Sequence, residues 1–181
     1  QWENLVEGIS RGERILYFPP LEEIQAFSIE GTYCTDFWCY PMFRSISESV
    51  NRPIPVGTMG LLVQQEHPLI KNFATRKWST PQWWSVVEAS RMMILDETRP
   101  SLRPVVQSID NFERNHKLGL LWEVKIGATK VLICSCDHRR LSESLEGRYF
   151  LKELYHYLDS SQFQPNEMLT MDELKKIFKN S

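Results

Sequence analysis

Two neighbouring apolar segments joined by a short turn constrain the fold more than any other part of this sequence. Residues 118–126 and 130–136 are rich in Leu, Val and Ile, and Gly127 and Ala128 lie between them. This arrangement is typical of a β-hairpin. In the second segment one face carries Val131, Ile133 and Ser135, and the other carries Leu132, Cys134 and Cys136. Since both faces are largely apolar, we expect an interior strand of a sheet that is covered on both sides.

Helical and strand patterns alternate around this hairpin, which predicts an α/β fold. Apolar residues at helical spacing predict helices over 2–10, 81–90 and 142–159, a helical turn over 67–73, and a last helix from Thr170. Short apolar runs predict strands over 14–18, 24–29, 61–63, 92–95 and 104–109. Residues 21–51 otherwise give no clear pattern, and 33–43 are unusually aromatic.

Local signals fix several of these helices more closely. Gly12 follows the first helix, where a left-handed residue commonly ends a helix, and Thr170 with Glu173 fits a capping box. The predicted core-facing residues are Leu151, Leu154, Tyr155 and Leu158 in the helix over 142–159, and Trp84, Val87 and Ala89 or Ser90 in the helix over 81–90.

Composition favours one ordinary globular domain over the whole chain. Of the 181 residues 42% are hydrophobic, and the formal net charge is -2. With no basic surplus and no run of about 20 apolar residues, we expect neither nucleic-acid binding nor membrane insertion. The sequence opens at Gln1 with a helical pattern and shows no signal peptide. We therefore expect a segment of a longer protein, in which the other half of the first α/β unit lies upstream.

The four cysteines leave several readings open. Cys34 and Cys39 lie in the aromatic segment and form a candidate disulfide, which geometry decides. Cys134 and Cys136 lie in the predicted interior strand, where buried thiols are expected. A Cys136–His138 pair is a weak candidate for nucleophile and base, because residues two apart on a strand are separated by about 6.6 Å. A metal site built from Cys134, Cys136 and His138 would need a fourth ligand that the sequence does not offer, so we expect no metal.

Other catalytic patterns are missing from the sequence. It contains neither phosphate-binding glycine motif nor the glycines of a nucleophile elbow, and we expect no cofactor. The carboxylate pairs Asp96 with Glu97 and Asp110 with Glu113 are neighbours in sequence rather than groups from separate strand ends. The remaining histidines are interpreted as surface or structural residues; they are His67, His116 and His156.

Tryptophan side chains are the remaining candidates for a binding site. The candidates for stacking on sugar rings are Trp38, Trp78, Trp83, Trp84 and Trp122. Core packing and contacts between domains are the alternative roles, because large aromatic side chains dominate both. Polar neighbours predict that Trp78 and Trp83 lie nearest the surface.

An ordered set of short segments resembles the C-terminal region of glycoside hydrolase family 2 proteins from gut Bacteroidetes. The segments are residues 57–62, 67–73, 82–84, 102–110, 121–127, 130–135 and 151–165. Their order is more specific than any one of them, and the similarity spans about residues 14–165. The segment 33–43 is the part that matches least.

The resemblance implies a fold and a setting. The fold is a flavodoxin-like, class I glutamine amidotransferase-like three-layer sandwich with a mostly parallel sheet. It also implies a jelly-roll domain, an immunoglobulin-like domain and a TIM barrel with two catalytic glutamates, none of which lies in this chain. The amidotransferase cysteine elbow and its His-x-Glu partner are not found here, so that activity is not implied. A periplasmic or extracellular location follows from the resemblance alone.

These observations combine into one hypothesis and two rivals. We expect residues 1–181 to form a single α/β accessory domain, with a core over about 14–165 and a C-terminal helix over about 170–179. It would be non-catalytic and would contact other domains of the same polypeptide or further copies of itself. The first rival is an ancillary carbohydrate-binding domain that uses exposed tryptophans. The second is a hydrolase or amidotransferase with a degenerate site.

Overall fold

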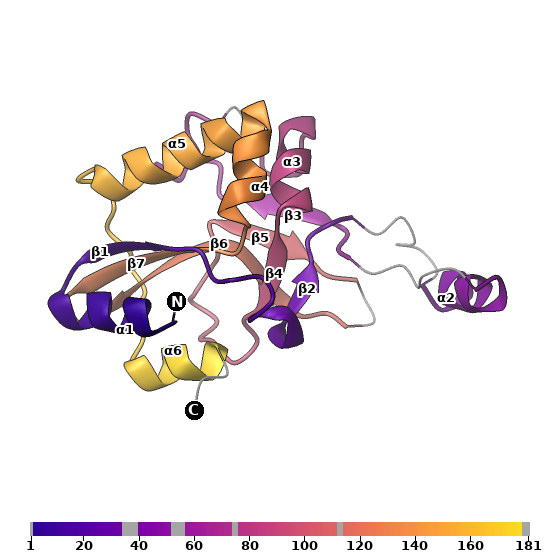
Figure 1. The fold of residues 1–181 in the computed structure, drawn as a ribbon, viewed down its shortest axis with the longest axis horizontal. Coiled ribbons are helices and arrows are strands. Elements are labelled where there is room, and N and C mark those ends of the chain that lie inside the picture. Colours follow the sequence, from indigo (N-terminus) through magenta and orange to yellow (C-terminus); the bar gives the residue numbers. More distant parts are fainter. Residues whose placement is uncertain (1, 34–39, 52–56, 74–75, 112–113, 179–181) are drawn as a thin grey trace.

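A seven-stranded sheet with helices on both faces forms the body of the protein (Figure 1). The computed structural model describes residues 2–33, 40–51, 57–73, 76–111 and 114–178. Within them the strands are β1 (Arg14–Tyr17), β2 (Ser28–Glu30), β3 (Gly60–Val63), β4 (Arg91–Ile94), β5 (Val106–Ile109), β6 (Lys117–Ile126) and β7 (Thr129–Cys134). The α/β class expected from the sequence is therefore confirmed.

The hairpin predicted from the sequence is the centre of this sheet. β6 and β7 pair antiparallel from Leu121 with Cys134 to Ile126 with Thr129. Gly127 at the turn has a φ of 59°, which glycine adopts without strain. β7 also pairs with β1, and the first half of β6 pairs with both β4 and β5. The long strand β6 thus joins the two halves of the sheet.

The prediction of a mostly parallel sheet is wrong. Among the described strands only β1 and β7 pair in parallel, and every other strand pairing is antiparallel. A parallel pair needs a crossover connection, usually a helix, whereas antiparallel neighbours can follow one another through short turns. The described residues between 91 and 134 contain four strands and no helix, so they form antiparallel neighbours. The flavodoxin-like arrangement does not describe this sheet.

Three helices cover the first face of the sheet, which we call the upper face. They are α3 (Trp84–Glu88), which follows a 3-10 turn over Pro81–Trp83, α4 (His138–Glu143) and α5 (Leu145–Asp159). Ser144 separates α4 from α5, and its hydroxyl accepts a hydrogen bond from the backbone N–H of Gly147. The single helix predicted over 142–159 is therefore mostly α5, with a separate short helix before it.

The opposite, lower face carries the two ends of the chain. α1 (Trp2–Arg11) and α6 (Met171–Ile177) lie there, with a 3-10 turn over Gln25–Phe27. Gly12 has a φ of 74°, as expected for the end of α1. The predicted capping box is confirmed, because the Thr170 hydroxyl accepts from the Glu173 backbone and the Glu173 carboxylate accepts from the Thr170 backbone.

Each face of the sheet has its own apolar core. The upper cluster includes Leu132, Cys134 and Cys136, and the lower cluster includes Val131 and Ile133. The two-sided burial predicted for this strand is therefore confirmed. β7 contributes to both cores and holds the three layers together.

One helix stands apart from the three layers. α2 (Tyr40–Ser49) lies at the far right of Figure 1, beyond the end of the sheet. It falls in the part of the sequence that gave no clear pattern. None of the described helices is long and apolar enough to cross a membrane.

Candidate functional site

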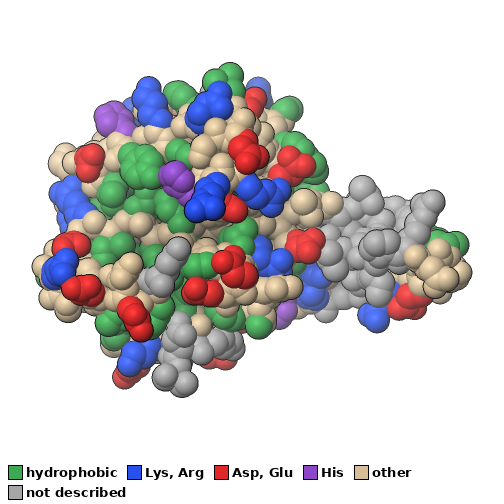
Figure 2. Space-filling view, viewed as in Figure 1, with side chains coloured by type: hydrophobic (Ala, Val, Ile, Leu, Met, Phe, Trp, Pro, Cys, Tyr) green, Lys and Arg blue, Asp and Glu red, His purple; other side chains and the backbone are tan. Residues whose placement is uncertain are grey.

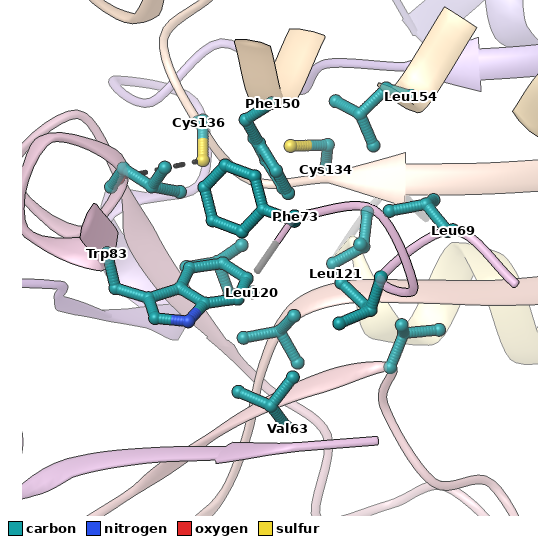
Figure 3. Packing of buried hydrophobic residues seen from close by; sticks show 14 of the residues in the cluster. Val63, Leu69, Phe73, Trp83, Leu120, Leu121, Cys134, Cys136, Phe150 and Leu154 are labelled. Atoms are coloured by element: carbon teal, nitrogen blue, oxygen red, sulfur yellow. Dashed lines mark hydrogen bonds between the residues drawn. The ribbon is translucent and has the colours of Figure 1, made fainter. Parts of the chain in front are cut away.

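The two cysteines of β7 lie in the densest part of the upper core. Cys134 and Cys136 lie on either side of Phe150 of α5 in Figure 3, and both are buried free thiols. The Cys136 thiol donates a long hydrogen bond of 3.9 Å to the Val86 carbonyl. Burial raises the pKa of Cys136 well above its usual range. A thiol that stays protonated and shielded from water is a poor nucleophile.

His138, the proposed partner of Cys136, belongs to a different environment. The chain leaves the sheet after β7, Asp137 caps α4 by accepting from two backbone N–H groups, and His138 is the first residue of that helix. The exposed imidazole lies 2.9 Å from the Tyr155 hydroxyl and packs edge-on against Phe18. Since thiol and imidazole have different partners, this arrangement does not support a catalytic pair. No group of three His, Cys, Asp or Glu side chains in the described part of the chain is placed to hold a metal ion.

A hollow lies beyond the carboxyl ends of the parallel strands β1 and β7. It has a volume of about 340 Å³ and is lined by Phe18, Pro19, Pro20 and the residues around Asp137. Ligands of parallel α/β sheets bind at this kind of position. Here Asp137 is used by the helix cap and His138 by Tyr155. These two polar groups therefore serve the fold.

The second polar cluster joins three distant parts of the chain. The Glu123 carboxylate of β6 accepts a 2.9 Å hydrogen bond from the Tyr157 hydroxyl of α5, and its other oxygen lies 3.6 Å from Nε2 of His67. Burial and the neighbouring carboxylate raise the pKa of Tyr157, so the phenol remains the donor. A pocket of about 250 Å³ opens beside this cluster, with Arg103 and Glu167 also in its lining.

The remaining carboxylate candidates make local structural contacts. Asp96 accepts from the Lys117 backbone at 2.7 Å and lies 2.6 Å from Nδ1 of His116. The buried Asp110 carboxylate binds the Arg114 guanidinium and the His116 backbone. Glu97 is exposed, and Glu113 lies outside the described residues. In the described part of the chain, Asp96 and Asp110 are thus both engaged in local structural contacts.

The division of the tryptophans into buried and exposed side chains differs from the prediction. Trp78 is 55% exposed, as expected, but Trp83 is fully buried against Phe73 and Phe150. Trp84, predicted to face inward, is 46% exposed and packs against Tyr33. The 3-10 turn before α3 has three residues per turn, which rotates the buried side by about one residue. Trp122 is buried in the lower core, and Trp38 lies outside the described residues, as do Cys34 and Cys39.

Trp78 belongs to an apolar surface on the lower face of the sheet. It forms an antiparallel bridge with Leu62 of β3, and Leu62 lies opposite Gln107 of β5, so these side chains share one face. Leu62 is 49% exposed and Ile109, on the same face of β5, is 39% exposed. We call Leu62, Trp78 and Ile109 the bare sheet face, because α1 and α6 lie at the other end of this face.

A second apolar surface runs along α2. Met42 and Ile46 of α2 and Val50, which directly follows the helix, are spaced four residues apart and are between 38% and 55% exposed. The Val50 backbone N–H still donates to the Ile46 carbonyl at 3.1 Å, so the helical path continues to Val50. Residues four apart lie on one side of a helix. The Arg44 and Glu48 side chains form an ion pair at 3.0 Å on the opposite side. We call Met42, Ile46 and Val50 the α2 ridge; α2 forms the right-hand end of the molecule in Figure 2.

Sequence comparison supplies the family. The sequence model of a family described as "Domain of unknown function (DUF8487)" matches residues 1–179. The chain belongs to this family. No characterised protein in a curated set matches this DUF8487 chain. The match covers nearly the whole chain, but the family description names no activity.

Sequence reasoning missed three features of this DUF8487 domain. The cluster of His67, Glu123 and Tyr157 brings together residues far apart in the chain, and only a carboxylate inside an apolar strand hinted at it. The bare sheet face depends on strand order, which the sequence did not reveal. The α2 ridge was detectable as an apolar residue at every fourth position from Met42 to Val50.

Proposed function

We propose that this DUF8487 chain is a non-catalytic accessory domain of a longer carbohydrate-active protein. The proposal rests on the resemblance of the chain to the C-terminal region of glycoside hydrolase family 2 enzymes. Its role there is structural, through contacts with other domains or between copies. A periplasmic or extracellular setting belongs to the same proposal and rests on the resemblance.

One observation carries the proposed role. The chain keeps its best nucleophile, Cys136, buried and protonated, while it places large apolar side chains outside on the bare sheet face and the α2 ridge. An enzyme needs the reverse, an accessible reactive group in a cleft. Exposed contiguous apolar surface is typical of a domain that binds another protein surface.

The first test is the size of the native gene product. An antibody raised against residues 1–181 is used to blot an extract of the source cells. We expect a band far above the 21.3 kDa of this chain. A band at 21.3 kDa would contradict the accessory role, because the chain would then act alone.

The second test separates a structural role from a catalytic one. Glycosidase turnover is measured on the complete gene product with Cys136→Ala and, separately, with the bare sheet face altered by Leu62→Glu. We expect Cys136→Ala to leave turnover unchanged and Leu62→Glu to weaken assembly or heat resistance of the whole protein. Turnover abolished by Cys136→Ala alone, in a protein that remains folded, would instead support a degenerate hydrolase or amidotransferase site.

Carbohydrate binding is the second candidate, and Trp78 favours it. The ring is more than half exposed on the bare sheet face, and the Arg76 guanidinium lies 5.8 Å from its centroid. A flat aromatic ring beside polar groups suits the apolar face of a sugar. Oligosaccharides are titrated into the chain while tryptophan fluorescence and NMR shifts are recorded. Binding lost with Trp78→Ala but kept with Trp84→Ala, which is similarly exposed elsewhere, would establish this role; no response across a broad glycan panel would remove it.

A further inference from the structure

The described fold has one helix that packs on no layer and one stretch of sheet that no helix covers. The helix is α2, of which no described side chain is buried. The stretch is the bare sheet face on β3 and β5. We propose that the α2 ridge of one copy packs on the bare sheet face of a second copy, and that the reciprocal contact forms a two-fold dimer. This inference rests on the proposed structural role and names its partner.

In the described part of the chain, the lower face of the sheet carries no helix over β3 and β5. Pairing continues across this face from Leu62 to Gln107, from Gln107 to Gly119, and from Gly119 to Met93. Met93 is fully buried in the lower core, whereas Leu62 is half exposed. No residue of β3 or β5 belongs to the lower cluster. Gln107 lies between Leu62 and Ile109 on this face, and the exposed apolar side chains around it are of the kind that a further layer, such as a helix, normally covers.

The α2 ridge has the form that a helix covering this face requires. Met42, Ile46 and Val50 are spaced by about 6 Å along the helix, which gives a ridge about 12 Å long. Leu62 and Trp78 lie on adjacent paired segments about 5 Å apart, so one helix can span them. The Arg44–Glu48 ion pair on the back of α2 would remain in solvent after docking.

A second copy is the partner that satisfies both surfaces at once. In the described position α2 lies beyond the end of the sheet of its own chain, apart from β3 and β5 (Figure 1). A two-fold dimer uses the same patches twice, each ridge on the opposite bare face. The exposed parts of the six side chains amount to on the order of 500 Å² per copy, against about 800 Å² per partner in a standard interface. Neighbouring exposed side chains such as Met59 extend the area.

Cysteine cross-linking tests the contact itself. Two single variants are made in a chain whose Cys34 and Cys39 are replaced by serine, one with Ile46→Cys and one with Leu62→Cys. Mixed and mildly oxidised, they are expected to give a disulfide-linked dimer, and Ser45→Cys in place of Ile46→Cys is expected to give none. Absence of a link in the mixture would overturn the proposal. So would a double variant, Ile46→Cys with Leu62→Cys, that links only within one chain.

Solution mass tests the consequence. Light scattering on the full 181-residue chain is expected to give twice the 21.3 kDa of one copy. Ile46→Glu and Leu62→Glu are each expected to weaken association more than tenfold, whereas Ser45→Glu, which adds the same charge at an exposed position outside the α2 ridge, leaves it unchanged. A monomeric native chain would overturn the dimer. It would leave the accessory role standing, since that role is tested separately by the size of the gene product.

Discussion

Glu123 shows how individual polar residues serve this fold. It lies within β6 between Trp122 and Val124, both fully buried, and its own side chain is only 13% exposed. Tyr157 of α5 donates to it, and His67 lies beside it. Because a buried carboxylate without partners is costly, this residue ties α5 and the segment after β3 to the sheet.

Removing the Tyr157 hydroxyl should show how much its hydrogen bond to the buried Glu123 carboxylate contributes to stability. We expect Tyr157→Phe to lower the free energy of unfolding by about 1–2 kcal/mol, because the Glu123 carboxylate loses its hydrogen bond while it remains buried. Urea unfolding followed by circular dichroism measures the change. Tyr155→Phe in the same helix removes a hydrogen bond to His138 that is exposed to solvent, and it should cost less than about 0.5 kcal/mol. If both changes cost the same, the bond to Glu123 does not stabilise the fold. In a double-mutant cycle, Glu123→Gln should reduce the effect of Tyr157→Phe.

At the scale of elements, the junction of α4 and α5 depends on a glycine. A Cβ built on Gly147 would lie 2.1 Å from the Leu141 carbonyl oxygen, closer than real contacts allow. We expect Gly147→Ala to destabilise the protein by about 1–3 kcal/mol, as overpacking does. Helix propensity alone would favour alanine, so the sign of the change separates the two effects. Thermal unfolding measures it, with the exposed Glu146→Ala as the matched control. A stabilised Gly147→Ala variant would show that α4 and α5 can separate at little cost.

The capping box of α6 should make stability depend on acid. Hydrogen bonds from the backbone and hydroxyl of Thr170, with Arg99 nearby, lower the pKa of Glu173 from its ordinary 4.5. A carboxylate with a lowered folded-state pKa stabilises the fold above its unfolded-state value and loses this contribution as the pH falls through the folded-state value. Glu173→Gln should therefore be less stable than the native chain at pH 7, by a difference that shrinks below about pH 4.5. Unfolding curves over this range measure it, beside Asp172→Asn in the same turn; a difference independent of pH would exclude the charge as the cause.

The elements that sequence predicted correctly are those with local signals. The hairpin was indicated by two apolar strand segments joined by a turn that contains glycine. α6 was indicated by the capping box of Thr170 and Glu173. Strand order depends on contacts between distant segments, so the antiparallel character of the sheet was missed. The 3-10 turn over Pro81–Trp83 interchanged the predicted roles of Trp83 and Trp84. The polar cluster around Glu123 was invisible because its members come from three separate elements.

At the scale of the whole molecule, the two apolar cores share the strands between them. β7 places Leu132 and Cys134 in the upper core and Val131 and Ile133 in the lower one. β6 likewise contributes Leu120 to the upper core and Trp122 to the lower. Because β6 and β7 each contribute side chains to both cores, loss of packing on one face of these strands should also destabilise the other face. We therefore expect the three layers to unfold together.

Damage to the lower layer should therefore be felt in the upper one. Leu174→Ala removes a fully buried side chain of α6 and should cost about 2–5 kcal/mol. Cys134 and Cys136 report from the upper core, where burial should keep both thiols unreactive until the protein unfolds. Thiol labelling, read by peptide mass in rising urea, should shift its midpoint together with circular dichroism in Leu174→Ala and stay in place in the exposed Lys176→Ala. If the circular dichroism midpoint of Leu174→Ala shifted while its thiol-labelling midpoint stayed unchanged, α6 would unfold separately from a sheet that remains folded without it. The upper layer and the sheet would then be the stable unit, and the lower layer a later addition to it.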